Sequence, residues 1–479
     1  MALKSIQIGP FFGVKLRQQG QDPALGWAEE GWNVDTEHGG LKRAGGFSRV
    51  YPTALTGSPT LFRLHLWPKA AGLPGCIALR SDGVLHYKES ENVWESLWGF
   101  QTAGEAGSRF DFLPVRMGDK EKLLIASGTG PLRCWEEDTD SITLFGTEEK
   151  LSDPTVNYLA LHFGRLFAAG DAAHPARLYW SQTPGDGRTL DNWGTAEAGA
   201  DVSGGHMEVG TDSEPITGLK AMSNQLVIFK KDRLYRLLGD RPSNFRIQPV
   251  EAPFRQPLHT ACLLWGDRLF FLTEDGLYYY DGQTLCRTPH SRDISPLLER
   301  ADLSACTGAA CGNRLYFTLK LDPANPYNDA MAEYDLERDC FLLRRGFQAV
   351  DLQSCRGKLY LLTGDGSVCA FDGSGSYNGA PIEAVWTSHW TALGSLYADK
   401  RILELTAVGR GMPLMFSVEW EDGSDMALLP LSIRKPLATA RLRGGGRRLR
   451  LSFLNGKGGD FCLESPMELL YDQQKRIPG

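Results

Sequence analysis

Short apolar runs separated by polar turns recur along most of the chain. The clearest unit runs from Asp267 to Asp281, DRLFFLTEDGLYYYD, where a mostly apolar run is followed by a turn ending at Gly276 and then by an aromatic run. Glycine tolerates the positive φ that a tight turn requires, so this unit predicts a β-hairpin. Similar units start at Gly357 and, with a weaker first half, at Cys76.

The units recur at a nearly constant spacing, with looser copies elsewhere. The residues that align at the first strand are Cys76, Leu123, Leu166, Leu226, Leu269, Leu315 and Leu359. Successive positions are 43 to 47 residues apart, except for one step of 60. The long step contains the polar, glycine-rich segment Thr183 to Gly210, which we interpret as a loop insertion.

A strand-like run precedes each copy, and most copies have another run after them. Four short strands in about 45 residues is the spacing of β-propeller blades. The sequence therefore predicts an all-β protein with a seven-bladed β-propeller over residues 53–380, interrupted by an insertion at 183–210. The 54 glycines and 26 prolines punctuate the chain too often for long helices.

Within a predicted blade, alternate side chains should pack against the two neighbouring blades. Leu269 and Phe271 are expected to face one neighbour, and Phe270 and Leu272 the other. Burial of both faces explains why the runs are nearly continuously apolar. The tyrosines from 278 to 280 fit a strand near solvent, where their hydroxyls remain hydrated while the rings pack.

Residues 1–52 show neither the strand repeat nor a helical pattern. The segment is rich in glycine, with Trp27, Trp32 and Phe47 between the glycines, which predicts an ordered arm. The arm could pack its aromatic side chains on the propeller rim. Its end, Phe47 to Tyr51, could supply an outer strand that closes the ring and removes an exposed sheet edge.

The pattern changes again over residues 381–479. Apolar runs joined by Gly and Asp turns predict five or more antiparallel strands and a small β-sandwich. The boundary lies near Ala380, although Glu383 to Trp390 could instead complete a blade, with the sandwich starting near Arg401.

This last segment carries seven basic residues within 17 positions and no acidic residue among them. They are Arg434, Lys435, Arg441, Arg443, Arg447, Arg448 and Arg450. In order of preference, the run is a solvated strand edge, a contact for an acidic partner subunit, or a contact for nucleic acid. Trp27 and Trp32 are further candidate partner contacts, because Trp and Arg are enriched at binding hot spots.

Net charge and cysteine usage exclude several classes of protein. The formal charge of -7 and a pI of 5.8 argue against a protein that binds nucleic acid by neutralising phosphates. Ten cysteines without CxxC pairs indicate reduced core residues. A secretion signal, a membrane-spanning run and a lipidation motif are all missing, so we expect a soluble protein made in the cytoplasm.

Motifs of catalysis and cofactor binding are also missing. The sequence has no HExxH, GxSxG, Walker or strand-linked GxGxxG motif. The loop from Asp372 to Asn378 alternates oxygen-bearing residues but lacks the distal glutamate of a calcium loop. We therefore expect no enzymatic activity, no metal and no cofactor.

Several short motifs resemble those of tailed-bacteriophage β-propeller virion proteins, such as tail-nozzle and packaged-DNA stabilisation proteins. They are Phe12-Gly13, Trp32-Asn33-Val34, Lys42-Arg43-Ala44-Gly45, the stretch from Gly164 to Gly239, and Ala384 to Trp390. The resemblance implies a structural virion protein of the tail or head–tail neck. It also implies a homo-oligomeric ring, perhaps sixfold, that contacts the portal, an adaptor or other tail proteins and continues or closes the DNA channel.

Two other classes stay open. An intracellular scaffold propeller would bind protein partners through its rims, but the Trp-Asp dipeptide and the paired glycines of the common repeats are missing. A carbohydrate-binding or glycosidase propeller would need clustered carboxylates, which a sequence cannot place.

Overall fold

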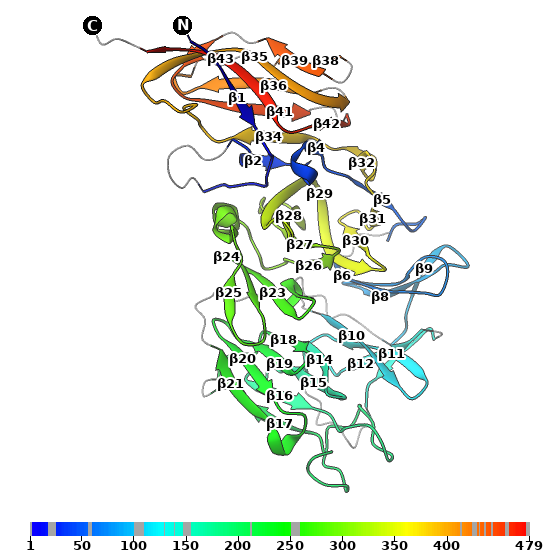
Figure 1. Ribbon diagram of the computed structural model, residues 1–479. Helices are drawn as coiled ribbons and strands as arrows, with labels where there is room; N and C mark the ends of the chain where they lie inside the picture. Colours follow the sequence, from blue (N-terminus) through cyan, green and yellow to red (C-terminus); the bar gives the residue numbers. More distant parts are fainter. Residues whose placement is uncertain are drawn as a thin grey trace.

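The computed structural model describes the chain except for several short segments. The described residues are 2–17, 25–55, 60–99, 110–128, 130–137, 139–146, 155–210, 213–250, 259–411, 414–423, 429–430, 432–434, 437–441, 444–455 and 459–475. The fold is all-β, with a stack of sheets at one end of the molecule and a succession of smaller sheets at the other (Figure 1).

Five four-stranded antiparallel sheets follow one another along the chain, each with its strands in sequence order. The first contains β6 (Leu61–Trp67), β7 (Gly75–Arg80), β8 (Gly83–Lys88) and β9 (Val93–Ser96). The second contains β10 (Asp111–Met117), β11 (Lys120–Ala126), β12 (Arg133–Glu136) and β13 (Ile142–Leu144). The third contains β14 (Tyr158–His162), β15 (Arg165–Ala169), β16 (Arg177–Trp180) and β17 (Gly205–Glu208).

The fourth sheet contains β18 (Gly218–Met222), β19 (Gln225–Phe229), β20 (Leu234–Leu238) and β21 (Arg246–Val250). The fifth contains β22 (Cys262–Trp265), β23 (Arg268–Thr273), β24 (Gly276–Tyr280) and β25 (Leu285–Arg287). Consecutive strands pair as hairpins, as the repeated sequence pattern predicted. The hairpin of β23 and β24 turns over Glu274 and Asp275, and Gly276 has a φ of 136°.

A nine-stranded sheet continues the succession. Its strands are β26 (Gly308–Cys311), β27 (Arg314–Leu319), β28 (Asn328–Asp335), β29 (Cys340–Cys355), β30 (Lys358–Thr363), β31 (Val368–Phe371), β5 (Phe47–Arg49), β32 (Ser376–Tyr377) and β33 (Ala380–Pro381). The first part of β29 pairs with β28, and the part after Ala349 pairs with β30. One long strand therefore serves two four-stranded groups, β26–β29 and β29–β31 with β5.

Strand β5 comes from the N-terminal arm and pairs with β31, so that Phe47 lies opposite Phe371 and Arg49 opposite Cys369. The prediction that this end of the arm supplies an outer strand is confirmed.

Apolar clusters join each sheet to the next. Leu269 and Phe271 pack with Val227 of the preceding sheet, whereas Phe270 and Leu272 lie in the cluster that contains Phe317 of the following one. The two-faced packing predicted for this strand is confirmed. A further cluster joins the first sheet, through Leu64 and Cys76, to Leu362 of the last group. The sheets thus form a β-propeller.

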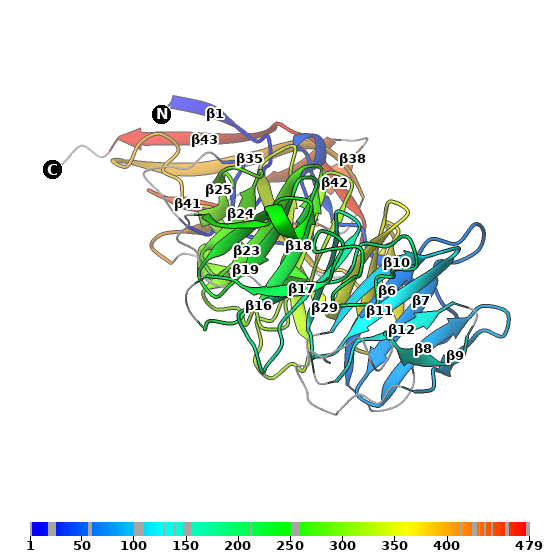
Figure 2. The same ribbon diagram turned by 90° about the horizontal axis from the view of Figure 1, so that it is seen from below.

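The remaining strands form two sheets at the other end of the molecule (Figure 1), which we call the sandwich. Seen from below, β1, β43 and β35 of one sheet lie side by side (Figure 2). One sheet contains β1 (Ala2–Ile8), β3 (Val34–Asp35), β4 (Leu41–Arg43), β35 (Ala398–Gly411), β38 (Ser432–Arg434), β39 (Leu437–Arg441), β40 (Gly445–Gly446), β42 (Phe461–Leu463) and β43 (Met467–Lys475). The other contains β2 (Ala28–Trp32), β34 (Ala384–Ser388), β36 (Met415–Trp420), β37 (Leu429–Pro430) and β41 (Leu449–Asn455). Leu405 and Leu469 of the first sheet share one buried cluster with Val418 and Phe453 of the second.

Helical structure in the described residues is limited to single turns. The α-helical turn α1 spans Ser295–Leu298, and the 3₁₀ turns are η1 (Glu37–Gly39), η2 (Pro242–Asn244), η3 (His259–Ala261) and η4 (Ser291–Ile294). None of the helices in this part of the chain is long and apolar enough to cross a membrane.

Two expectations need correction. The segment 183–210 is not all loop, because Gly205–Glu208 forms strand β17 and pairs with β16. Tyr280 is not near solvent: its side chain is fully buried, and its hydroxyl donates to the Gln225 side chain 3.1 Å away. The neighbouring sheet packs over this strand and buries Tyr280 more completely than the strand's own sequence pattern predicts. Seven of the ten cysteines are buried free thiols, in line with the predicted core role.

Candidate functional site

The N-terminal arm joins the propeller to the sandwich. Strand β1 pairs with β43, and β2 pairs with β34, so the arm adds a strand to each sandwich sheet. Strand β4 pairs with β42, while β5 completes the last group of the propeller. Val14 also donates its N–H to the carbonyl of Phe341 in β29, at 2.8 Å. Because these partners are distant in sequence, the arm fixes how the propeller and the sandwich are placed relative to each other.

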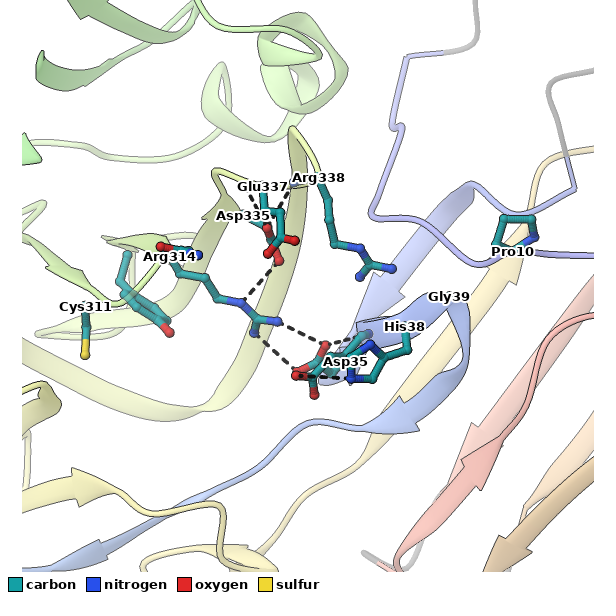
Figure 3. A pocket seen from close by; sticks show the side chains of 12 residues that line it. Pro10, Asp35, His38, Gly39, Cys311, Arg314, Asp335, Glu337 and Arg338 are labelled. Carbon is teal, nitrogen blue, oxygen red and sulfur yellow. Dashed lines mark hydrogen bonds and ion pairs between the residues drawn. The ribbon is translucent and has the colours of Figure 1, made fainter. Parts of the chain in front are cut away.

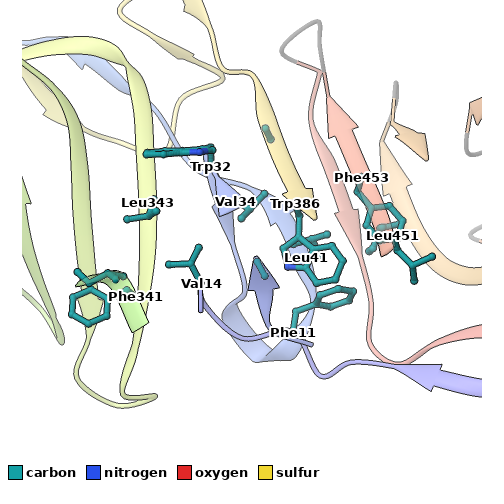
Figure 4. Close-up of a cluster of buried hydrophobic side chains, with 14 of the residues drawn as sticks. Phe11, Val14, Trp32, Val34, Leu41, Phe341, Leu343, Trp386, Leu451 and Phe453 are labelled. Carbon is teal, nitrogen blue, oxygen red and sulfur yellow. The ribbon is translucent and has the colours of Figure 1, made fainter. Parts of the chain in front are cut away.

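An apolar cluster fills this junction (Figure 4). Phe11 of the arm packs edge-on against Trp386 of the sandwich, with ring centroids 5.0 Å apart. Trp32 packs in the same cluster and is 8% exposed, with the Arg345 guanidinium 4.9 Å above its ring. Trp32, a candidate partner contact in the sequence, therefore has little of its surface accessible in this chain. The ring is buried because β2 is sandwiched between β29 and β34, a placement that the local sequence does not show.

Trp27, the other candidate contact, is half-buried. Its ring stacks on Phe12 at 5.0 Å and lies 4.8 Å from His290 of the propeller. Lys15 places its ammonium 5.5 Å from the same ring. Part of Trp27 stays accessible, and its role as a partner contact remains a prediction.

Asn33 connects the arm to both bodies through one buried side chain. Its Nδ2 donates to the carbonyls of Arg345 and Glu383, at 3.0 and 2.8 Å. Its Oδ1 accepts from the Arg345 N–H and the Tyr377 hydroxyl, both at 2.9 Å. The residue has a φ of 56°, which asparagine tolerates better than most residues. This side chain belongs to the Trp32-Asn33-Val34 motif, whose sequence gave no sign of these four hydrogen bonds.

A charged pocket of about 730 Å³ lies between the arm and the propeller (Figure 3). Arg314 of β27 reaches Asp35 of the arm at 3.3 Å, Glu333 at 3.3 Å and Asp335 at 3.4 Å. Arg344 pairs with the other oxygen of Glu333. Arg338 donates to the hydroxyl of Thr36 at 3.0 Å.

These charges stabilise one another. Burial alone would raise the pKa of Asp35, but Arg314, together with Lys42 and Arg344, outweighs burial and holds the pKa below the usual value. The pKa of Arg314 lies above its usual value, against the effect of its own burial, because of the carboxylates around it. Removing one charged side chain from such a buried set lowers the free energy of unfolding by about 3–5 kcal/mol. The charged side chains around the pocket thus form an ionic contact between the arm and the propeller.

A second cavity, of about 230 Å³, is lined by the first strands of most of the propeller sheets. Asp351 of β29 accepts from the Leu64 N–H of β6 at 2.8 Å and pairs with Arg63 at 3.3 Å. Asp111 of β10 accepts from the Leu159 N–H of β14 at 2.9 Å. Burial raises the pKa of Asp351. Polar side chains around this cavity therefore link one sheet to the next.

The basic residues of the sandwich are only partly described. Arg447 lies 3.7 Å from Asp399, and Arg448 lies 3.5 Å from Glu421. Arg450 pairs with Glu419 and with Glu29 of the arm, the latter at 3.7 Å. Acidic side chains from other parts of the chain thus lie close to these basic residues, although the run from 434 to 450 contains no acidic residue itself.

Arg434 and Arg441 lie on β38 and β39, with side chains outside the described residues. Lys435 and Arg443 also lie outside the described residues.

Among the residues that the structure describes, no three His, Cys, Asp or Glu side chains are grouped so as to hold a metal ion. In the loop after β31, Asp372 accepts from the Ser374 N–H at 2.9 Å, which is an ordinary turn contact.

Comparison with known proteins finds no matching family model and no matching curated protein. Among solved structures, the chain is similar to the extracellular domain of BT4673 from B. thetaiotaomicron, at 13% identity over 68% of this chain and 40% of that chain, with a TM-score of 0.45. It is also similar to virginiamycin B lyase from Staphylococcus aureus, at 8% identity over 66% of this chain and 97% of that chain, with a TM-score of 0.45.

A third similar structure is the computationally designed Ika8 protein, at 13% identity over 75% of this chain and 99% of that chain, with a TM-score of 0.42. The chain spans less than half of the BT4673 domain. Similarity at these levels gives no information on ligand or activity.

Proposed function

We propose that this chain is a structural binding protein: a seven-bladed propeller that carries a sandwich at a fixed angle and contributes both as one rigid subunit to a protein assembly. The observation that carries the proposal is the arm, whose strands pair with both sandwich sheets and with the last propeller group. Domains in one chain normally move relative to each other unless a large apolar interface holds them. Here apolar, ionic and strand contacts all act at the junction.

The proposed count of seven blades rests on the order of the four-stranded groups. Five separate sheets and the two groups that share β29 would form a ring, and β5 would close the last blade. The cluster between Leu64 and Leu362 would be the seam between the first and last blades. Closure of this kind leaves no exposed sheet edge in the ring.

A non-catalytic role is supported by the state of the charged groups. In the pocket beside the arm, Asp35 and Asp335 are engaged by Arg314, and next to the propeller cavity Asp351 is engaged by Arg63 and backbone N–H groups. A general base or nucleophile needs a free, oriented group next to space for a substrate. We therefore propose that neither space is an active site.

The resemblance to tailed-phage virion proteins makes the proposal more specific. Asn33 and Arg43, from two of the three arm motifs that carry the resemblance, contact parts of the chain that lie far away in sequence. We propose a virion protein of the tail or the head–tail neck, assembled as a homo-oligomeric ring next to a portal, adaptor or other tail protein. DNA would pass through the ring without tight binding, which suits a net charge of -7.

Native mass spectrometry and electron microscopy of the purified chain test the assembly. We expect a closed cyclic oligomer, either alone or when a portal or adaptor is added as template, with seven blades in each subunit. Particles from the host should contain the chain in a fixed number of copies, and a portal or terminase gene should lie beside its gene.

A strictly monomeric chain that is missing from particles would overturn the virion proposal. If that chain still captured specific protein partners, an intracellular scaffold propeller would be the remaining interpretation.

A further inference from the structure

The segment between β16 and β17, which accounts for the one irregular step in the sequence repeat, forms one wall of a groove. The cavity is about 570 Å³, within the range of about 300–1,000 Å³ found for ligand sites. The opposite wall comes from β10, β11 and β12 of the neighbouring sheet. Figure 1 shows β16 and β17 at the end of the molecule opposite the sandwich.

The wall formed by this segment is held firmly in place. Arg165 of β15 is 1% exposed and donates to the carbonyls of Ser181 and Ser203, at 2.7 and 2.8 Å, and to that of Asp201. Leu190 and Trp193 are buried in the cluster between the second and third sheets. The groove is therefore formed before any partner binds, which reduces the entropy cost of binding.

Positive charge predominates in the lining. Arg116, Lys120, Lys122 and Arg188 line the groove together with one carboxylate, Glu136. Lys120 and Lys122 hold Glu136 between them, at 2.6 and 2.8 Å, and their hydrogen bonds lower its pKa to about 2.

Two further acids lie at the edge. Asp186 pairs with Arg188 at 3.3 Å, and Asp191 accepts from the Thr189 hydroxyl. Arg116 makes no ion pair within the described residues; its Nε donates to the Gly118 carbonyl at 3.3 Å. The Lys120 side chain is 70% exposed, and Arg116 is also an exposed residue. Arg116 and Lys120 therefore remain accessible to an anion in the groove.

We propose that this groove binds an acidic, extended peptide segment of another protein. Met117, Pro184 and Leu190 line the same groove as the cations, which fits a peptide with apolar residues among its acids. Nucleic acid fits less well, because no aromatic side chain lines the groove for a base to stack on. This inference does not depend on the virion proposal, since it concerns the end of the molecule away from the arm and the sandwich.

Fluorescence anisotropy with a labelled peptide of alternating Asp, Glu and Leu residues tests the site on the full chain. We expect saturable binding that weakens as salt rises. The double variant R116Q/K120Q should bind about tenfold more weakly, because it removes the two most accessible cations. A matched control, K231Q/R246Q, removes two exposed cations from the fourth sheet and should stay within about twofold of the wild type.

Charge reversal provides the second test. The R116E/K120E variant should lose the acidic peptide and gain a matching Lys and Leu peptide, provided that its melting curve stays like that of the wild type. The proposal is overturned if the wild type binds no acidic peptide, if the control variant loses as much affinity, or if single-stranded DNA or inorganic phosphate outcompetes the peptide at the same site.

Discussion

Asn33 illustrates how much of the junction depends on single side chains. Asparagine is common in loops, and nothing in its sequence neighbourhood distinguishes this one as a buried hub. The structure places it against Arg345, Tyr377 and Glu383, which are more than 300 residues away. Such a site is invisible to periodicity, because the hydrogen-bond partners come from strands that meet only in the folded chain.

The N33A variant should be strongly destabilised. It would remove the four hydrogen bonds of the Asn33 side chain, each contributing about 0.5–1.5 kcal/mol. We expect the free energy of unfolding to fall by about 2–4 kcal/mol, measured by urea denaturation.

N378A is the matched control, because Asn378 has a similar φ of 49° but an exposed side chain. Equal losses in the two variants would mean that backbone strain, not the hydrogen-bond network, dominates.

Two buried histidines should make stability depend on pH. Burial lowers the pKa of His65 and of His162 to about 4, from the ordinary histidine value of about 6.5. The unfolded chain therefore binds more protons than the folded chain between pH 6.5 and 4, so stability is complete above pH 6.5 and is lost as pH falls through this window.

Melting temperatures from pH 7 to 4 measure the effect. H162L should flatten the decline, while the same change at exposed His174 should leave the decline as in the wild type. If H162L and the wild type fall in parallel, His162 does not contribute to it.

At the scale of elements, the propeller strands were largely predictable and their surroundings were not. Alternation within the run around Leu269 correctly assigned side chains to two neighbouring sheets, because burial on both faces leaves a continuous apolar run. The same pattern misjudged Tyr280, since its exposure depends on Gln225 in the preceding sheet. The strand inside the segment 183–210 was missed because GHME lacks the apolar residues that mark a strand.

Arg165 should hold the segment between β16 and β17 against the third sheet. In the R165M variant the carbonyls of Ser181, Asp201 and Ser203 lose their donor, and the apolar replacement cannot supply one. We expect faster hydrogen exchange and proteolysis within residues 181–204, together with a lower melting temperature.

The control for this variant is R177M, which removes an arginine on β16 that pairs with Glu208 at a more exposed position, at 2.8 Å. Protection of residues 181–204 that is unchanged in R165M would show that Leu190 and Trp193 anchor the segment without it.

At the scale of the whole molecule, the sequence indicated a propeller, an arm and a second group of strands, but not how they connect. The arm strands are two to seven residues long and have no repeat, so their partners could not be inferred from pattern. The sequence predicts an arm that packs on the propeller rim, whereas β2, which carries Trp32, is an integral strand of the sandwich. Pairing of β1 with β43 brings the first and last strands together.

The basic residues of the sandwich provide the test of assembly at this scale. Arg447 and Arg448 pair with Asp399 and Glu421 on the surface, and exposed pairs of this kind contribute only about 0–1 kcal/mol to stability. The R441S/R443S/R447S/R448S variant should therefore remain folded. If the residues face an acidic neighbouring subunit, the variant should be incorporated less into particles at low salt, and the deficit should shrink at high salt, where screening weakens the same attraction in the wild type.

The D399N/E421Q variant provides the opposite perturbation. It removes the internal partners of Arg447 and Arg448 while keeping the arginines, so incorporation should be at least as efficient as in the wild type. Quantitative mass spectrometry of purified particles, at low and high salt, compares all three chains. Equal incorporation of the four-serine variant and the wild type at both salt concentrations would show that the basic run is a solvated edge, balanced by the acids of its own chain.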